Sequence, residues 1–298
     1  MKILLLGKNG QVGHALQRTL LPLGSLVTKD RQDVDLSDAS KLKSMLEAES
    51  PDLIINAAAY TAVDKAESDA ATARAINTTA VELMARYAQQ RDALLVHYST
   101  DYVFDGTKPT PYEVHDTTNP QSVYGLTKRD GELAILDSGC RAIVLRTSWV
   151  FSEHGGNFIK TVLRLAKERE ALKIVADQWG APTSAELIAD VTAHAIAGNR
   201  HGILPTGLYH LTASGDTTWH GLARRVVSRA LERGVQLRVG VDAIHPIATQ
   251  DYPLPAARPE NSRLDTKALS SPLQLQLPDW TVHVDRTVDQ LTSLEHSA

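Results

Sequence analysis

The chain has 298 residues and a formal net charge of −4, from 31 Lys and Arg against 35 Asp and Glu, and 43% of its residues are hydrophobic. This near-balanced charge lacks the basic excess that neutralises nucleic-acid phosphates, so nucleic acid is not an expected partner. The single cysteine, Cys140, excludes an intrachain disulfide and a multi-cysteine zinc site. The length suits one large α/β unit or a main domain with a smaller lobe.

The first apolar run, Ile3–Leu6, is shorter than the roughly 7–15 apolar residues of a secretory signal. No segment approaches the roughly 20 apolar residues of a membrane span. We therefore expect a cytoplasmic protein without a membrane partner.

In chain order, short apolar runs alternate with helical patterns, which indicates crossover units and a parallel sheet. The expected strands are Ile3–Leu6, Ser25–Thr28, Leu53–Asn56, Leu94–Ser99 and Ala142–Arg146, and the expected helices are Gln11–Leu23, Ala39–Glu49, Thr72–Arg91 and Tyr124–Leu136. Most of these strands are continuously apolar, as in a sheet covered by helices on both faces. The fold class is therefore α/β, a Rossmann-like doubly wound parallel sheet with a smaller α/β lobe.

The alternation weakens after about residue 150. Two polar stretches with prolines, 177–183 and 253–263, are expected to form exposed loops. We expect residues 1–150 to form a dinucleotide-binding sheet domain and residues 151–298 to form mainly a substrate-binding lobe, with some exchange of chain between the two.

A glycine-rich segment joins the first strand to the first helix. Gly7, Gly10 and Gly13 permit a tight turn, a close approach of backbone to a pyrophosphate, and close packing of the helix on the sheet. The helix N-terminus then offers free N–H groups and the positive end of its dipole to the phosphates. Together with Gln11 and Val12, these glycines are predicted to bind NADPH or NADH.

The end of the second strand carries the expected determinants of cofactor choice. Asp30 can bind the adenosine ribose hydroxyls, which favours NAD, whereas Lys29 or Arg31 can face the 2′-phosphate of NADP, and the same cluster is also what an ordinary solvated loop contains. Asp35 and Leu36 are candidates to bracket the adenine, although Asp35 also suits a helix cap.

Tyr124 and Lys128 stand four residues apart at the start of a predicted helix, so their side chains share one face. A phenol with an ordinary pKa of about 10 exchanges protons poorly at neutral pH unless a cation stabilises its charged form, and Lys128 can supply that cation. Thr100 follows a predicted strand, in the crevice where open α/β sheets bind ligands. These three residues are predicted to be catalytic.

The chain resembles the extended short-chain dehydrogenase/reductase family, and within it the enzymes that reduce 4-keto sugars carried on dTDP. The matching segments are 7–13, 56–67, 99–106, 119–128, 146–151, 177–183 and 258–264. The resemblance implies NAD(P)H-dependent reduction of the C4 ketone of dTDP-6-deoxy-L-lyxo-4-hexulose to dTDP-L-rhamnose, the last step of dTDP-rhamnose synthesis. Related dehydratases carry an Asp-Glu pair after the threonine, but here Asp101 is followed by Tyr102.

The resemblance also implies roles for individual residues. Tyr124 would donate the proton and Lys128 would lower its pKa and hold the ribose, while Thr100 would hold the carbonyl oxygen. Ala59, Tyr60 and Thr61 would cover the cofactor, and the predicted substrate contacts are Val63, Thr100, Asp101, Trp149, Arg258 and Arg263, the two arginines binding the diphosphate as charge-assisted forks. Core packing for Val63 and Trp149, a solvated helix start at 64–67, and surface salt bridges for the arginines are the simpler alternatives.

Some members of the family hold Mg²⁺ between carboxylates at a dimer contact. Here Ala15 stands where that pattern has a glutamate, and Glu186 keeps a second candidate carboxylate. No metal ligands are assigned, Mg²⁺ is doubtful, and a homodimer stays open. The alternative functions are another nucleotide-sugar 4-ketoreductase, a 4-epimerase, or a non-catalytic NADP-binding regulatory subunit, which would be expected to have lost the Tyr/Lys pair.

Overall fold

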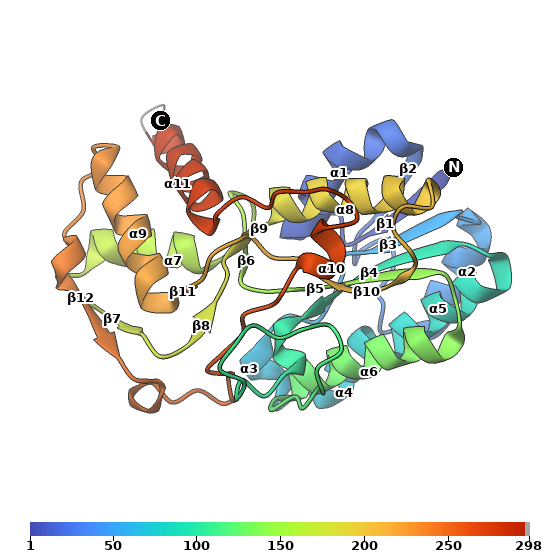
Figure 1. The fold of residues 1–298 in the computed structure, drawn as a ribbon, viewed down its shortest axis with the longest axis horizontal. Coiled ribbons are helices and arrows are strands. Elements are labelled where there is room, and N and C mark those ends of the chain that lie inside the picture. Colours follow the sequence, from blue (N-terminus) through green and yellow to red (C-terminus); the bar gives the residue numbers. More distant parts are fainter. Residues whose placement is uncertain (296–298) are drawn as a thin grey trace.

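The computed structural model describes residues 1–295 and centres on a six-stranded parallel sheet (Figure 1). The strands are β1 (Lys2–Leu6), β2 (Ser25–Lys29), β3 (Leu53–Asn56), β4 (Leu94–Thr100), β5 (Ala142–Thr147) and β10 (Gly207–His210), in the order β10-β5-β4-β3-β1-β2. All neighbouring pairs are parallel. The Rossmann-like fold and the five predicted strands are confirmed, and β10 is a sixth strand that the sequence did not indicate.

Helices cover both faces of the sheet, because alternate side chains of each strand point to opposite sides. Ile3 and Leu5 of β1 pack in one core with α1 (Gln11–Leu20) and α8 (Ala185–Arg200). Leu4 and Leu6 pack in the other core, with α2 (Ala39–Glu49), α5 (Ala80–Arg91) and α6 (Val123–Ser138). The continuous apolar strands are thus explained by burial on both faces.

The predicted helix Thr72–Arg91 is interrupted. It consists of α4 (Ala70–Arg74), a π-helical turn over Ala75–Thr79, and α5. Buried Asn77 in this turn accepts from the Tyr60 N–H at 2.9 Å and donates to the Tyr60 carbonyl at 3.1 Å and to Thr127 at 3.2 Å. The widened turn therefore fixes the loop after β3 against α6, a constraint that helical periodicity alone does not reveal.

The second lobe has its own core, formed by α7 (Phe158–Glu168), α9 (Trp219–Glu232), α11 (Trp280–Glu295) and the parallel pair β7 (Leu172–Val175) and β12 (Ile244–Ile247). The shorter elements are α3 (Val63–Ala66), α10 (Lys267–Ser270), β6 (Val150–Phe151) paired with β9 (Thr183–Ser184), and β8 (Trp179–Gly180) paired with β11 (Thr217–Thr218). Between α7 and α9, the chain returns to the sheet through α8 and β10. A functional division at residue 150 stays a prediction.

The two segments predicted to be exposed loops are exposed only in part. Segment 177–183 is mostly buried, because Gln178 donates to Thr249 at 3.0 Å and accepts from the Trp219 indole at 3.1 Å. In 253–263 the first residues are exposed, but Asn261 is buried and donates to the carbonyls of Lys108 and Thr110. Polar composition did not predict the exposure of these segments, because partners within the protein satisfy their polar groups.

Within residues 1–295, no helix is both long and apolar enough to cross a membrane.

The glycine loop yields a test of the packing. A Cβ at Gly13 would lie 2.0 Å from the Gly7 carbonyl oxygen. We expect Gly13→Ala to displace the loop, to cost about 1–3 kcal/mol of folding stability, and to weaken NADPH binding in a fluorescence titration. Gly156→Ala is the matched control, since a Cβ there meets no atom within 4 Å. Equal behaviour of the two variants would contradict this account.

Candidate active site

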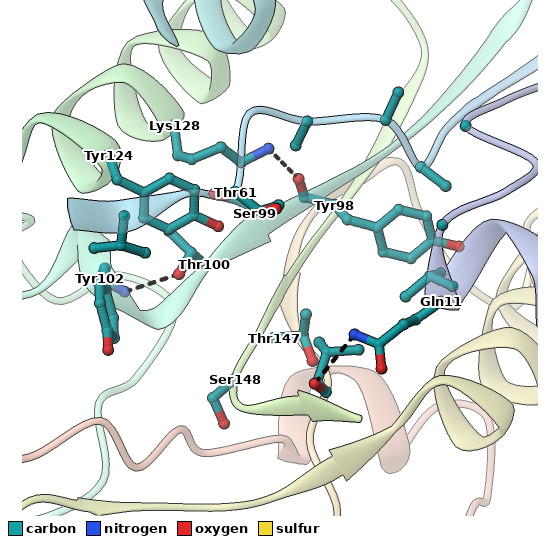
Figure 2. Close-up of a pocket in the computed structure, with 18 of the residues that line it drawn as sticks. Gln11, Thr61, Tyr98, Ser99, Thr100, Tyr102, Tyr124, Lys128, Thr147 and Ser148 are labelled. Carbon is teal, nitrogen blue, oxygen red and sulfur yellow. Dashed lines mark hydrogen bonds between the residues drawn. The ribbon is translucent and has the colours of Figure 1, made fainter. Parts of the chain in front are cut away.

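A cavity of about 1050 Å³ runs along the carboxyl ends of the strands, between the sheet and the second lobe. Figure 2 shows Tyr124, Thr100 and Lys128 at one end of this pocket and Gln11 at the other. The predicted residues that line it are Gly7, Gly10, Gln11, Val12, Asp30, Asp35, Ala59, Thr61, Val63, Thr100, Asp101, Tyr124, Lys128 and Trp149. A neighbouring cavity of about 280 Å³ adds Leu36 and Tyr60.

The glycine loop forms the floor of the pocket beside α1. Gly7 has φ +84°, and a Cβ there would lie 2.8 Å from the Ala58 nitrogen, so both backbone conformation and space require glycine. Gly10 is the N-cap of α1, where the first helical N–H groups lack intrahelical acceptors. Gly13 lies behind the loop and packs on Gly7. The loop and helix N-terminus fit a pyrophosphate.

Gln11 joins this loop to the second lobe. Its side-chain oxygen accepts from Asn157 at 3.0 Å and from Ser152 at 3.3 Å, and its amide nitrogen donates to the Val150 carbonyl at 3.5 Å. The neighbouring His154 ring contacts the Asn9 carbonyl at 3.2 Å. The predicted cofactor loop is therefore also part of the contact between the lobes.

The end of β2 places both kinds of cofactor determinant at the pocket. The Asp30 carboxylate accepts hydrogen bonds from Asn9 at 2.8 Å and from the N–H of Gln32 at 2.8 Å, so much of its hydrogen-bonding capacity is already used within the chain. The Arg31 side chain lines both cavities, is 79% exposed, and pairs with Asp35 at 3.2 Å. Leu36 is buried in the wall of the smaller cavity, a position suited to one face of an adenine.

Tyr124 lies in the first turn of α6, which Ser122 caps by accepting from the Gly125 N–H at 3.2 Å. Burial raises the pKa of Tyr124 to about 12, while a hydrogen bond with Thr100 acts in the opposite direction. Lys128 is one turn further and is buried, and its ammonium nitrogen lies 2.6 Å from the Tyr98 carbonyl. Burial lowers the pKa of Lys128 to about 8. Lys128 is directed at the Tyr98 carbonyl here, and the lowering of the Tyr124 pKa by Lys128 stays a prediction.

Thr100 and Asp101 end β4 beside the tyrosine. The Thr100 hydroxyl donates to Asp101 at 2.9 Å and accepts from the Tyr102 N–H at 3.2 Å. Burial raises the pKa of the Asp101 carboxyl to about 6, against hydrogen bonds from Ser262 and Thr100 that lower it. The Ser99 hydroxyl, the Thr147 hydroxyl and one Asp101 oxygen are buried without a hydrogen-bond partner among residues 1–295. Since all three residues line the pocket, these atoms mark it as a ligand site.

Trp149 forms an aromatic wall with a residue that the sequence did not single out. Its ring stacks on Trp219 with centroids 3.7 Å apart, and both rings line the pocket. Trp149 has φ +46°, and a Cβ on Gly180 would lie 2.6 Å from its indole. The strained backbone and the glycine beneath it hold the indole in place, which suits a binding wall better than simple core packing.

Arg258 and Arg263 do not line either cavity. Arg258 pairs with Asp64 through two bonds of 2.9 and 2.7 Å, and so ties the second lobe to α3. Arg263 donates to Asn261 at 2.8 Å and to the Pro109 carbonyl at 2.6 Å. The structure therefore gives both arginines internal partners, and their predicted contact with a diphosphate stays a prediction.

The candidate metal carboxylate, Glu186, lies 3.5 Å from Arg286 and 3.9 Å from His283. Within residues 1–295, no group of three or more His, Cys, Asp or Glu side chains is arranged to hold a metal ion.

Sequence reasoning missed several pocket residues: Trp219, Tyr102, Ser99, Thr147 and Ser148. The last three follow or end β4 and β5, so their position at the carboxyl ends of parallel strands was an available signal. Trp219 begins α9, far in sequence from the ends of β4 and β5 that carry the other pocket residues, and only the packing of the two lobes brings it to the site.

The Rossmann-like sheet, the glycine turn and the adjacent Thr100, Tyr124 and Lys128 define an extended short-chain dehydrogenase/reductase. The family model described as "RmlD substrate binding domain" matches residues 1–293. The dTDP-4-dehydrorhamnose reductases of Burkholderia thailandensis and Escherichia coli K12 are 48% and 47% identical, over 98% of this chain and 100% and 98% of their own lengths. The chain therefore belongs to the dTDP-4-dehydrorhamnose reductase family of oxidoreductases.

Solved structures agree. The dTDP-4-dehydrorhamnose reductase of Clostridium acetobutylicum superposes with a TM-score of 0.89 at 33% identity, covering 98% of this chain and 99% of that one. The Bacillus anthracis enzyme, solved in complex with NADP, gives a TM-score of 0.85 at 32% identity over 97% and 99% of the chains. UDP-glucose 4-epimerase of Thermus thermophilus, at 17% identity and a TM-score of 0.79 over 98% and 99%, shares the fold.

Asp101 generates a prediction about pH. Because its folded-state pKa of about 6 exceeds the ordinary 3.8, the folded protein binds the proton more tightly, and this group's contribution to stability falls as pH rises from about 4 to 6. A shift of this size corresponds to about 3 kcal/mol. We expect Asp101→Asn to remove that slope in urea unfolding measured at pH 4, 5, 6 and 8.

Asp105 provides a control of opposite sign. Hydrogen bonds from Thr107 and Tyr112 lower its pKa to about 2, so its contribution is present at neutral pH and is lost in acid. Asp105→Asn should therefore lower stability at pH 7 and leave the slope due to Asp101 in place. An unchanged slope in Asp101→Asn would show that this carboxyl titrates normally.

Proposed function

We propose that this protein reduces the C4 ketone of dTDP-6-deoxy-L-lyxo-4-hexulose to dTDP-L-rhamnose, with NADPH or NADH as reductant. The observation that carries the proposal is the meeting of Tyr124, Thr100 and Lys128 at one end of a pocket whose other end is the glycine loop. Membership of the reductase family supports the reaction, and the NADP complex of the Bacillus anthracis relative supports the cofactor.

The residues fit the dinucleotide along the length of the pocket. Gly7, Gly10 and the N-terminus of α1 would hold the pyrophosphate, with Gln11 and Val12 beside it. Leu36 would pack on the adenine in the smaller cavity, and Ala59, Tyr60 and Thr61 would cover the cofactor. Bound in this way, the nicotinamide supplies a hydride to the C4 carbon of the sugar.

Tyr124 acts as the general acid. Because burial raises its pKa to about 12, its phenol stays protonated at neutral pH and can donate to the oxygen that becomes negative as the ketone is reduced. The Thr100 hydroxyl, which hydrogen-bonds to Tyr124, would hold the same carbonyl oxygen by turning its proton from Asp101 to the substrate. Lys128 would hold the nicotinamide ribose and stabilise the phenolate that is left after the proton is given.

The other end of the substrate would lie against the second lobe. Trp149 and Trp219 offer a flat apolar surface to the deoxysugar, and Val63 and Asp101 line the same space. Arg258 and Arg263 would reach the diphosphate only by exchanging their present partners, Asp64 and Asn261. A cytoplasmic location stays a prediction, Mg²⁺ stays doubtful because Ala15 replaces the family carboxylate, and a homodimer stays open.

The proposal is tested by following NADPH absorbance with the dTDP-4-keto sugar. The wild type should oxidise one NADPH for each sugar reduced, whereas a 4-epimerase would consume none. Tyr124→Phe should lower kcat by about 10²–10⁴-fold, because the proton donor is lost, while the sugar still binds in calorimetry. Near-wild-type turnover by Tyr124→Phe would contradict the proposed mechanism, and absence of NADPH oxidation by the wild type would contradict the proposed function.

Arg31 tests how the two cofactors are accommodated. We propose that its exposed guanidinium turns from Asp35 to the 2′-phosphate of NADPH. Arg31→Ala should raise KM for NADPH about tenfold, equivalent to about 1.4 kcal/mol, and leave KM for NADH nearly unchanged. Arg18→Ala, an exposed arginine on α1 paired with Asp190, is the control. An equal rise in both KM values would show that Arg31 supports the structure of the loop and does not bind the 2′-phosphate.

A further inference from the structure

The residues beside the Trp149 ring come from one small unit of the second lobe. The strands β8 and β11 pair antiparallel, with Gly180 opposite Thr217. Gln178 lies just before β8, and Trp219 lies just after β11 at the first position of α9. This β8–β11 unit, residues 178–180 and 217–219, therefore brings Gln178 and Trp219 together although they are 41 positions apart in the chain.

A series of hydrogen bonds fixes the orientation of the Trp219 ring. An indole N–H can only donate, and here it donates to Oε1 of Gln178 at 3.1 Å. The Gln178 amide nitrogen donates to the Thr249 hydroxyl at 3.0 Å, and that hydroxyl donates to the Asp177 carboxylate at 2.6 Å. Gln178 is 4% exposed, and each donor in the series has its acceptor, so each bond supports one arrangement of the others.

The Trp219 ring in turn holds Trp149. The two rings are stacked, with centroids 3.7 Å apart and planes 11° apart. A second close approach to the Trp149 indole comes from Gly180, where a Cβ would lie 2.6 Å from Cε2 and 2.9 Å from Nε1. Phe158 also contacts the Trp219 ring, with centroids 4.8 Å apart. Trp149 is therefore held from two directions by the β8–β11 unit.

Packing alone does not determine where the Trp219 ring lies. Trp149 and Trp219 both line the cavity of about 1050 Å³, so both rings border open space. Gln178 is not part of the cavity lining, and its oxygen holds the indole N–H from outside the pocket. Without this acceptor the N–H would lack its partner, and rotation of the ring into the cavity would let water satisfy it.

We propose that Gln178 and Trp219 are positioning residues for the sugar-nucleotide substrate: Gln178 selects the orientation of the Trp219 ring, and Trp219 keeps Trp149 at the wall that receives the sugar. The proposal deepens the reductase function proposed above and rests on it. Both rings pack against the core of the second lobe, whereas the glycine loop and the end of β2 belong to the sheet. A change at Gln178 should therefore act on the sugar nucleotide and not on NADPH.

The orientation of the two rings can be measured in the free protein, because stacked indoles couple their electronic transitions and give a pair of circular dichroism bands of opposite sign. We expect these bands in the wild type, their loss in Trp219→Phe, and their retention in Trp280→Phe, since Trp280 packs in the core and does not line the cavity. Gln178→Met keeps a similar side-chain length but removes the acceptor, and it should weaken the bands. Absence of the bands in the wild type, or unchanged bands in Gln178→Met, would overturn the proposal.

Calorimetry and kinetics test the consequence for the substrate. Gln178→Met should weaken binding of dTDP-L-rhamnose about five- to tenfold, as expected for the loss of one buried hydrogen bond, and should raise KM for the keto sugar by a similar factor. The value of kcat should stay unchanged, because the wall binds the substrate and the transition state alike. NADPH, and dTDP without its sugar, should bind to this variant as they bind to the wild type.

Equal weakening of dTDP and dTDP-L-rhamnose would show that Gln178 supports the lobe as a whole, and unchanged affinity for both would show that it has no part in binding; either result would overturn the proposal. Failure of the reductase function would appear separately, as a wild type that oxidises no NADPH, because circular dichroism of the free protein needs no turnover. Thr249→Val removes the acceptor of the Gln178 amide and should act in the same direction with a smaller effect. It takes the place of Gln178→Met if that variant does not fold.

Discussion

The close approach of α6 to the end of β4 is the constraint on which the site depends. A Cβ at Gly125 would lie 2.2 Å from the Tyr102 carbonyl oxygen, and one at Gly131 would lie 2.3 Å from that of Asn77. Two glycines within a helix cost about 1 kcal/mol each relative to alanine. They allow the helix backbone to lie directly on its neighbours, which places Tyr124 against Thr100 and Lys128 against Tyr98.

That approach also removes water from the reacting groups. Tyr124, Lys128 and Asp101 all have pKa values moved toward their uncharged forms by burial. In a folded protein such groups reduce stability, and they persist where a ligand or a reaction needs them. The partnerless hydroxyls of Ser99 and Thr147 belong to the same pattern. The pocket is therefore built from groups whose hydrogen-bonding capacity is kept for a ligand.

The sequence allowed the sheet, the glycine turn and the Tyr/Lys pair to be predicted, because each has a local cause: apolar runs, glycine spacing, and residues four apart on a helix. The π-helical turn at 75–79 was not predictable in this way, since its cause is the contact of Asn77 with Tyr60 and Thr127. Trp219 and β10 were missed for a similar reason. Both come from the second half of the chain, where long-range packing decides which segment returns to the sheet.

Gln11 is part of the cofactor loop and also of the contact between the two lobes. It begins the helix beneath the expected pyrophosphate, and its amide holds Ser152 and Asn157 at the entrance to the second lobe. If dinucleotide binding displaced the loop, the contacts of Gln11 with Ser152 and Asn157 would move with it, and with them the lobe that carries the aromatic wall. Thermodynamic linkage requires such an effect to be mutual: whatever factor the dinucleotide applies to the affinity for the sugar nucleotide, the sugar nucleotide applies to the dinucleotide. Through the contacts of this one glutamine, the affinity for each ligand can depend on whether the other ligand is bound.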